Sequence, residues 1–178
     1  MDYKQKLIDW NSTDKYRLEL KFLNGLLCPL WDMKVLDYGC GTGAAMRYID
    51  SRNDFSIING YDVNDFLSEW SYTVRDSKLE HKYNHVYLMH SIAHFKNQSE
   101  ELEKIKSVLL ENGIVTVITP NAEWLDKDYV GDETVIKHFT QQELCQLFID
   151  SGYTIQLVGQ FGEYKNGMNE RIFLQATV

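Results

Sequence analysis

The sequence has little cysteine and little proline, and both shortages narrow the class of protein. Three cysteines occur among 178 residues, at Cys28, Cys40 and Cys145, and no two of them form a Cys-x-x-Cys pair. An odd number of widely separated cysteines argues against a disulfide framework and against a structural zinc site, so we expect a protein of the reducing cytoplasm. The chain has only two prolines and no Ser/Gly-rich stretch. No linker is therefore predicted, and residues 1–178 are expected to form a single domain.

Basic side chains and long apolar runs are also scarce. Eighteen lysines and arginines stand against 26 aspartates and glutamates, which gives a net charge of −8 at pH 7. A negative surface opposes binding to phosphate backbones and to anionic membranes, so no nucleic-acid partner and no membrane partner are predicted. The sequence has no uninterrupted run of about 18 apolar residues, and its first residues lack the apolar segment of a secretory signal. Neither a membrane span nor export is predicted.

Helix and strand patterns alternate along the chain. Residues 1–30 are predicted to form a helical cap, whose apolar face carries Tyr16 and three leucines, ahead of a core at 31–178. Strands are predicted at 34–38, 55–61, 72–74, 85–90, 114–119, 153–158 and 171–178, and helices at 44–50, 65–70, 99–110 and from the capping box Thr140–Glu143 to Gly152. This alternation is typical of a mainly parallel sheet with helices on both faces, which binds ligands beyond the carboxyl ends of its strands.

Three alternate glycines follow the first predicted strand, in the segment Val35-Leu-Asp-Tyr-Gly-Cys-Gly-Thr-Gly43. Because glycine has no Cβ atom, such a loop can turn sharply and approach a ligand closely. The helix predicted at 44–50 directs its free N–H groups toward the same place. A purely structural turn would explain one or two of the glycines, but the strand–loop–helix context with three of them favours a nucleotide-type ligand.

Two ligands fit this loop. Gly39-x-Gly41-x-x-Ala44 satisfies the dinucleotide fingerprint, and Asp62 lies 19 residues after Gly43, at the end of a predicted strand, where an acid binds ribose hydroxyls. Asp37 distinguishes between these two kinds of ligand. A carboxylate two residues before the first glycine is unfavourable near a diphosphate and favourable near an ammonium group. A ligand with an ammonium group at one end and an adenosyl ribose at the other is S-adenosylmethionine.

The same segments resemble a known family. Val35–Gly43 closely resembles the first motif of class I S-adenosylmethionine-dependent methyltransferases, and Tyr61-Asp62-Val63 resembles the second. Three later segments are similar, in order, to the fourth strand, to the helix-to-fifth-strand signature of the family's small-molecule enzymes and to the next helix: His85–Phe95, Glu111–Asn121 and Phe139–Tyr153. The resemblance implies an α/β fold: a Rossmann-like, doubly wound, seven-stranded sheet, mostly parallel, with an antiparallel last strand and helices on both faces.

The resemblance also implies the residues that bind the donor. They are Asp37, Gly39, Cys40, Gly41, Gly43, Asp62, Val63 and Asp76. The glycine loop would pass beside the methionine moiety, and the first acid would hold its ammonium group through water or the loop backbone. The second acid would accept both ribose hydroxyls, with the following valine packed against adenine. Asp76, in Arg75-Asp76-Ser77, is the only candidate for the family's adenine-binding third motif.

Two histidines are the predicted catalytic residues. A hydroxyl or ammonium acceptor needs a base to remove its proton, and histidine titrates near neutrality. His90 and His94 follow the fourth predicted strand, where the methyl group should be delivered. No metal site is predicted from the histidines, because His85 and His90 lie five positions apart on one strand and would point to opposite faces.

The acceptor pocket is predicted from aromatic side chains above the strand ends. The candidates are Tyr3, Trp10 and Tyr16 near the start of the chain and Trp124 and Tyr129 in the irregular segment 121–137. The alternative that the two tryptophans only anchor loops stays open. Tyr61 is predicted to belong to the core.

These observations predict an S-adenosylmethionine-dependent methyltransferase that acts on a small-molecule acceptor, as a monomer or a homodimer. A catalytically silent methyltransferase-like binding protein is the first alternative, because it would keep the fold and the donor site. An NAD(P)-binding oxidoreductase is the second, and it fits less well because the sequence has no evident Tyr-x-x-x-Lys pair and no second domain.

Overall fold

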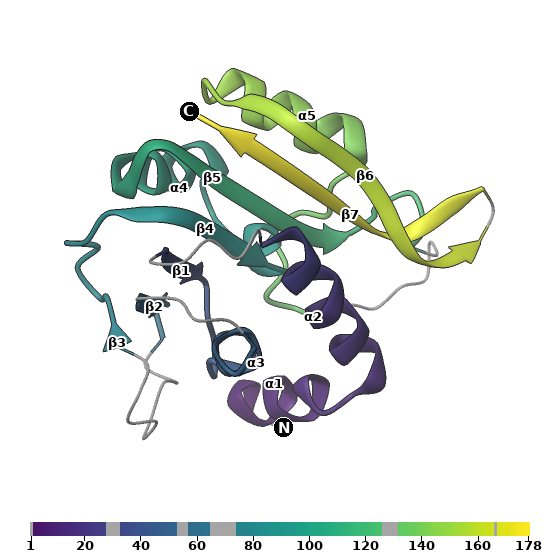
Figure 1. Ribbon diagram of the computed structural model, residues 1–178. Coiled ribbons are helices and arrows are strands. Elements are labelled where there is room, and N and C mark those ends of the chain that lie inside the picture. Colours follow the sequence, from purple (N-terminus) through teal and green to yellow (C-terminus); the bar gives the residue numbers. More distant parts are fainter. Residues whose placement is uncertain (1, 28–32, 53–56, 65–73, 126–131, 166) are drawn as a thin grey trace.

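The computed structural model describes residues 2–27, 33–52, 57–64, 74–125, 132–165 and 167–178 (Figure 1). Along the chain its elements are α1 (Tyr3–Asn11), α2 (Asp14–Leu26), β1 (Lys34–Tyr38), α3 (Ala44–Asp50), β2 (Ile57–Tyr61), β3 (Val74–Arg75), β4 (Tyr83–Met89), the 3-10 helix η1 (Ser91–His94), α4 (Gln98–Val108), β5 (Leu109–Pro120), α5 (Gln141–Asp150), β6 (Thr154–Lys165) and β7 (Met168–Thr177). Within this part of the chain, no helix has the length and apolar character that crossing a membrane requires.

The described strands form one seven-stranded sheet in the order β3-β2-β1-β4-β5-β7-β6. β1 pairs in parallel with β2 and β4, and the parallel pairing continues outward to β3 and β5. β7 lies between β5 and β6 and is antiparallel to both. The predicted sheet, mostly parallel with an antiparallel last strand, is therefore confirmed. Strand order reverses between β1 and β4, so the carboxyl ends of these two strands flank the crevice where such sheets bind ligands.

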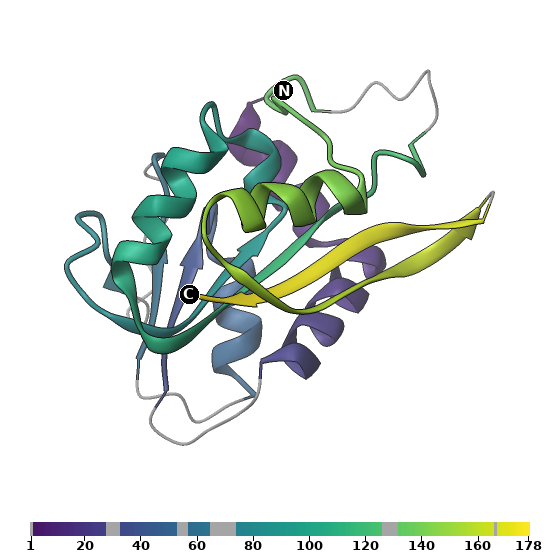
Figure 2. The same ribbon diagram turned by 90° about the horizontal axis from the view of Figure 1, so that it is seen from above.

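Helices cover both faces of the sheet (Figures 1 and 2). α4 and α5 lie on one face, where their buried side chains, such as Leu102 and Phe148, pack with one side of the central strands. α2 and α3 lie on the other face, where Leu23 and Ile49 are fully buried in a second cluster. Burial of apolar surface stabilises a fold by about 25 cal/mol per Å². The two helical layers therefore hold the strand ends in fixed positions.

Local signals account for the helix boundaries. The side chain of Thr13 accepts a hydrogen bond from the backbone N–H of Tyr16 and so starts α2, which splits the predicted cap into two helices. The predicted capping box is confirmed at α5, where Thr140 and Glu143 bind each other's backbone N–H at 3.1 and 2.9 Å. The helix predicted at 99–110 ends earlier, at Val108, because Leu109 already pairs with Tyr83 of β4.

The closing strands differ from the prediction in length: β6 has 12 residues and ends at Lys165 rather than at Val158, and β7 begins at Met168, three residues before the predicted start. Beyond the pair Pro120–Arg171, the described residues of β6 and β7 pair as strands only with each other and form a two-stranded arm that projects past the sheet (Figure 1). Polar residues and glycines make this segment look like a loop in the sequence. Phe161 stacks on Phe22 of α2, with ring centroids 3.9 Å apart, which fixes the base of the arm. The helix predicted at 65–70 lies outside the described residues, as does most of the strand predicted at 72–74.

Acid is expected to destabilise this fold through His85, which lies in the middle of the sheet. The side chain is 1% exposed, and burial lowers its pKa to about 3. In the unfolded chain the same group takes up a proton near its ordinary pKa of about 6.5. The unfolded state therefore binds more protons between these two values, and the free energy of unfolding should fall by about 1 kcal/mol for each pH unit below pH 6. Chemical denaturation at pH 6.5, 5.5 and 4.5 measures this slope.

The variant His85→Gln should remove most of that pH dependence. Glutamine can still bond to the hydroxyl of Thr116, which lies 2.7 Å from His85 Nε2, but it does not titrate. His81→Gln is the matched control, since the His81 side chain is 52% exposed. An unchanged slope in His85→Gln would contradict the prediction.

Candidate active site

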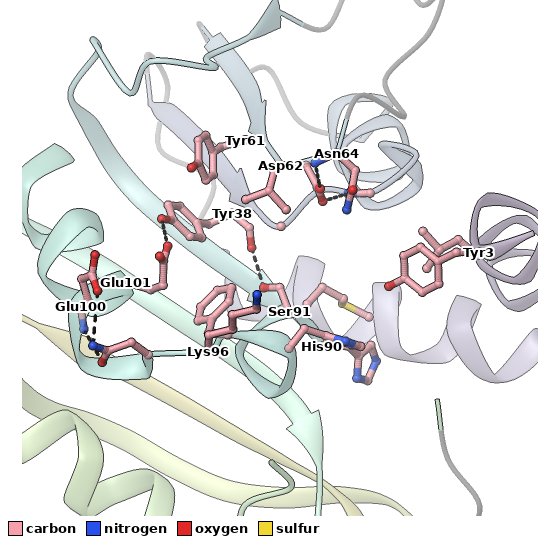
Figure 3. Close-up of a pocket in the computed structure, with 18 residues that line it drawn as sticks. Tyr3, Tyr38, Tyr61, Asp62, Asn64, His90, Ser91, Lys96, Glu100 and Glu101 are labelled. Atoms are coloured by element: carbon pink, nitrogen blue, oxygen red, sulfur yellow. Dashed lines mark hydrogen bonds between the residues drawn. The ribbon is translucent and has the colours of Figure 1, made fainter. Parts of the chain in front are cut away.

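A cavity of about 520 Å³ opens at the carboxyl ends of β1, β2 and β4 (Figure 3). Its floor is the glycine loop after β1, and one wall is the turn after β2 with Asp62 and Val63. His90 and η1 form the opposite wall, and Tyr3 of α1 closes one end. Its volume lies within the range of pockets that bind small molecules and cofactors. The cavity is therefore placed where the sheet topology predicts a ligand site.

Backbone geometry explains the glycines of the loop. Gly39 and Gly41 adopt φ values of +86° and +51°, a left-handed conformation that disfavours side chains. The N–H groups of Gly39 and Cys40 both bond to the carbonyl of Tyr61, at 2.7 and 3.1 Å, which ties the loop to the end of β2. Gly39 and Gly41 both line the cavity. The loop thus presents bare backbone to a ligand.

Asp62 connects the turn after β2 to the glycine loop. Its Oδ2 accepts a hydrogen bond of 2.8 Å from the N–H of Gly41, and its Oδ1 accepts one of 2.8 Å from the N–H of Asn64 (Figure 3). Each carboxylate oxygen can accept a second bond, because it carries two lone pairs. Asp62 is therefore held in place and can still bind hydroxyl groups of a ligand.

Three predicted donor-site residues do not line the cavity. Asp37 is 1% exposed and lies beside Tyr87, and burial raises the pKa of its carboxyl well above the usual range. Cys40 is buried, and burial raises the pKa of its thiol. Gly43 bonds to the carbonyl of Cys40 and forms the N-terminal cap of α3. These residues shape the loop from beneath.

Asp76 is also separate from the cavity. It is 4% exposed, and it accepts hydrogen bonds from the Tyr83 hydroxyl at 2.6 Å and from the backbone of Glu80 and His81. Burial raises the pKa of this carboxyl, but the hydrogen bonds outweigh burial and the net shift is downward. The geometry of Asp76 is that of a residue that holds the turn between β3 and β4.

The four histidines at positions 81, 85, 90 and 94 have four different partners. His81 contacts Asp76, and His85 contacts Thr116. His94 lines the cavity and lies 2.9 Å from the hydroxyl of Thr134, and burial lowers its pKa. His90 lines the cavity as well, and its Nε2 lies 2.6 Å from Oε2 of Glu19. The two predicted catalytic histidines are thus the two that face the cavity.

The sequence prediction missed Glu19, although a signal was available. Glu19 falls three positions after Tyr16, on the apolar face of α2, and is 3% exposed. Its Oε1 binds Nε of Arg171 on β7 at 2.5 Å. Burial raises the pKa of this carboxyl, but contacts with His90 and Arg171 outweigh burial, so the pKa lies below its usual value. A charged residue on a buried helix face indicates a buried ionic partner.

Some of the predicted aromatic residues line the cavity, and others do not. Tyr3 and Tyr61 line the cavity, and Tyr61 is therefore more than a core residue. Trp10 lies outside the lining, and its ring is nearly perpendicular to that of His90, with the ring centroids 6.2 Å apart. Tyr16 is buried beneath the cavity, Trp124 lies near Lys15, and Tyr129 falls outside the described residues.

The charges around the cavity suit a cationic ligand. Among the described lining residues, the acids are Asp62, Glu100 and Glu101, and the only lysine or arginine is Lys96. A diphosphate would meet an excess of negative charge here, whereas a ligand that carries sulfonium and ammonium groups would be attracted. Together with the bare glycine loop and the open lone pairs of Asp62, this fits S-adenosylmethionine better than a dinucleotide.

Comparison with known proteins gives a family. A family model described as "Methyltransferase domain" matches residues 10–158. A search of curated proteins finds no match. Three solved structures illustrate the similarity of fold. A SAM-dependent methyltransferase from Aquifex aeolicus is 13% identical, with a TM-score of 0.75 over 99% of this chain and 98% of that one.

The other two structures carry more specific names. Magnesium protoporphyrin IX methyltransferase from Synechocystis, solved with bound SAH, is 14% identical, with a TM-score of 0.66 over 99% of this chain and 88% of that one. The small RNA methyltransferase HEN1 is 15% identical, with a TM-score of 0.69 over 91% of this chain but 25% of that one. At these identities the structures show a shared fold. The chain belongs to the methyltransferase domain family, and its fold is that of the class I S-adenosylmethionine-dependent methyltransferases.

Proposed function

We propose that this protein is an enzyme that transfers the methyl group of S-adenosylmethionine to a small-molecule acceptor. One observation carries the proposal: Asp62, fixed by the N–H groups of Gly41 and Asn64, presents its carboxylate to the cavity directly beside a bare glycine loop. A carboxylate at the end of the second strand and a glycine loop after the first are the two elements that recognise an adenosyl ligand in such sheets.

The residues that face the cavity would hold the donor. Gly39 and Gly41 would lie beside its amino-acid tail, Asp62 would accept its ribose hydroxyls, and Val63, which is 82% exposed at the cavity wall, would cover the adenine. Asp37, Cys40, Gly43 and Asp76 would support these positions from behind. When bound, the donor supplies a methyl group on a sulfonium sulfur, whose leaving group is a neutral thioether.

The protein's own part in catalysis is to position the acceptor and to accept its proton. Holding two reactants in line supplies a large share of the acceleration in such displacements. His90 and His94 are the candidate bases, because both line the cavity at the end of β4. Tyr3 and Leu7 of α1 cover the cavity, and the side chain of Asn11 in the same helix donates a 2.9 Å hydrogen bond to Thr42 of the loop. This cover would exclude water from the reacting groups.

Charge and cavity size support a small acceptor. The net charge of −8 opposes binding to a polynucleotide, and the cavity walls carry three carboxylates. Magnesium protoporphyrin IX, which one structural neighbour methylates, is a small molecule, whereas another neighbour acts on small RNA. Since this chain covers only 25% of that RNA enzyme, we favour the small molecule and keep RNA as an acceptor in the test.

Replacing Asp62 with alanine is expected to weaken the binding of S-adenosylhomocysteine by about tenfold to a hundredfold, because hydrogen bonds to a carboxylate contribute roughly 1.5–3 kcal/mol each. Titration calorimetry measures the affinity. Asp62→Asn should cause a smaller loss, since the amide keeps one acceptor oxygen. Asp50→Ala is the matched control, because Asp50 is exposed at the end of α3. Thermal unfolding of each variant separates lost binding from lost structure.

Two outcomes would contradict the donor assignment. One is an S-adenosylhomocysteine affinity that Asp62→Ala leaves unchanged, and the other is binding of NADH in its place. Transfer of labelled methyl groups to a panel of metabolites and to short RNA then separates an enzyme from a silent binding protein. Binding without transfer to any member of the panel would favour the silent protein.

A further inference from the structure

His90 has an unusual backbone position at the edge of the cavity. It directly follows β4 with φ at +64°, a left-handed conformation that non-glycine residues rarely adopt. Its N–H bonds at 2.8 Å to the carbonyl of Ile118 on β5, which secures this conformation. Uncommon backbone conformations of this kind persist where the surroundings enforce them, and they cluster at functional sites. The backbone conformation therefore fixes the point from which the His90 side chain extends.

Glu19 holds the other end of the His90 side chain, through the imidazole ring. The Glu19 carboxylate lies 2.6 Å from Nε2 of His90 through one oxygen and 2.5 Å from Nε of Arg171 through the other. The side chains of Glu19 and Arg171 are 4% and 5% exposed, so neither can turn away into solvent. The ring centroid of Trp10 lies 6.2 Å from that of His90 and 6.0 Å from Cζ of Arg171. One carboxylate thus couples the histidine to a buried arginine.

This arrangement selects a tautomer. A carboxylate can only accept hydrogen bonds, so a neutral imidazole that bonds to Glu19 through Nε2 must carry its proton there. Nδ1 is then unprotonated and can accept a proton. The imidazole lines the cavity, and its side chain is 17% exposed. The nitrogen free to act on a ligand is the one that Glu19 does not bind.

We propose that Glu19 is a positioning residue that holds His90 with Nδ1 as the proton acceptor for a methyl acceptor bearing an O–H or N–H group. The inference rests on the proposed function. In the step itself, the acceptor oxygen or nitrogen forms a bond to the methyl carbon while the carbon–sulfur bond breaks and leaves its electron pair on sulfur. The proton lost by the acceptor moves to Nδ1 of His90. The negative charge of Glu19 then stabilises the imidazolium ion, as the carboxylate does in a catalytic triad.

The variant Glu19→Gln tests the tautomer directly. Arg171 can only donate hydrogen bonds, so it should remain bonded to the amide oxygen of the glutamine. The NH₂ group of the glutamine should then face His90. Nε2 must then accept, and the proton should move to Nδ1. Nitrogen-15 NMR of the histidine side chains in the ligand-free protein reports which nitrogen is protonated. We expect protonated Nε2 in the wild type and protonated Nδ1 in Glu19→Gln.

Glu170→Gln is the matched control for this experiment. Glu170 is also buried and also binds Arg171, with its Oε1 3.1 Å from Nη1 of the arginine, but the structure shows no bond from it to His90. This variant removes one carboxylate from the same ionic cluster and should leave the His90 tautomer unchanged. A purely structural role for Glu19 would make the two variants behave alike.

Kinetics complete the test. With the hydroxyl or amine acceptor that the wild type methylates fastest in the panel, Glu19→Gln should lower kcat by about 10²–10⁴-fold, the range for loss of an oriented base. KM and S-adenosylhomocysteine affinity should change less than about threefold. An unchanged tautomer, a kcat within about threefold of the wild type or a preference for carboxylate or thiolate acceptors would each overturn the proposal. If the wild type methylates no acceptor, the proposed function fails, while the tautomer still decides whether Glu19 orients His90.

Discussion

Replacing Arg171 with methionine is expected to lower the free energy of unfolding by about 3–5 kcal/mol, since it leaves a buried carboxylate without its counter-charge. Arg171 is 4% exposed and lies between Glu19 and Glu170. Glu170 would keep its ion pair with Lys15, but Glu19 would keep only His90. For a chain of 178 residues this corresponds to a decrease of roughly 10 °C in the unfolding temperature. Urea denaturation and calorimetry measure both quantities.

Two further variants show whether the buried charge is the cause. Glu19→Gln combined with Arg171→Met should be more stable than Arg171→Met alone, because the uncompensated charge is then gone. Arg17→Met is the control for loss of an arginine. Arg17 pairs with Asp14 at 3.3 Å, and these side chains are 64% and 95% exposed. Exposed pairs contribute little, so this change should stay within about 0.5 kcal/mol. A similar small effect in Arg171→Met would show that the cluster is unimportant for stability.

Replacing Gly39 with alanine is expected to cost about 2–4 kcal/mol and to weaken S-adenosylhomocysteine binding at least about tenfold, because the loop must move. A Cβ atom at Gly39 would lie 2.2 Å from Cβ of Ser91, and φ at this position is +86°. Ser91 cannot easily retreat, since its hydroxyl donates a 2.5 Å hydrogen bond to the carbonyl of Tyr38. Chemical denaturation and titration calorimetry test the two effects separately.

The clash and the backbone strain can be distinguished. Adding Ser91→Gly to Gly39→Ala removes the clashing atom and should recover part of the lost stability, leaving the cost of the left-handed conformation, about 1–2 kcal/mol. Gly25→Ala is the control, because a Cβ there would meet no atom within 4 Å and Gly25 lies inside α2. That change should stabilise the protein by about 0.5–1 kcal/mol. Equal effects at positions 25 and 39 would contradict the assigned role of Gly39.

Features that depend on neighbouring residues were predicted well from the sequence. β1 and α3 have their predicted bounds, and the capping box opens α5 as expected. These elements depend on side-chain periodicity and on hydrogen bonds three residues apart, which the sequence shows directly. The arm of β6 and β7 was missed because pairing between those strands, rather than their composition, makes them extended. Strand propensity alone does not report such pairing.

In the candidate site, too, features that depend on neighbouring residues were predicted better than features that depend on distant ones. Gly39, Gly41 and Asp62, three of the predicted donor-binding residues, line the cavity, because they follow strands whose carboxyl ends face the ligand crevice, and their binding of a donor stays a prediction. Asp37 and Asp76 were predicted to bind the donor, Asp37 through water or the loop backbone, and both carboxylates are buried and do not line the cavity. Whether a carboxylate near a strand end faces the crevice or the layer beneath it depends on the side chains packed around it. For Asp37 those include Tyr16 and Tyr87, which come from other elements.

By itself, the sequence determined the family, the order of helices and strands, and the loop that can approach an adenosyl ligand, since each is encoded by residues close together in the chain. Tertiary structure alone decided which histidine at the cavity contacts a buried carboxylate. Glu19 and Arg171 are 152 positions apart, and Glu19 and His90 are 71 positions apart. They meet because α2 packs on the face of the sheet where β4 and β7 flank β5, and no local pattern specifies which distant charges share one buried space.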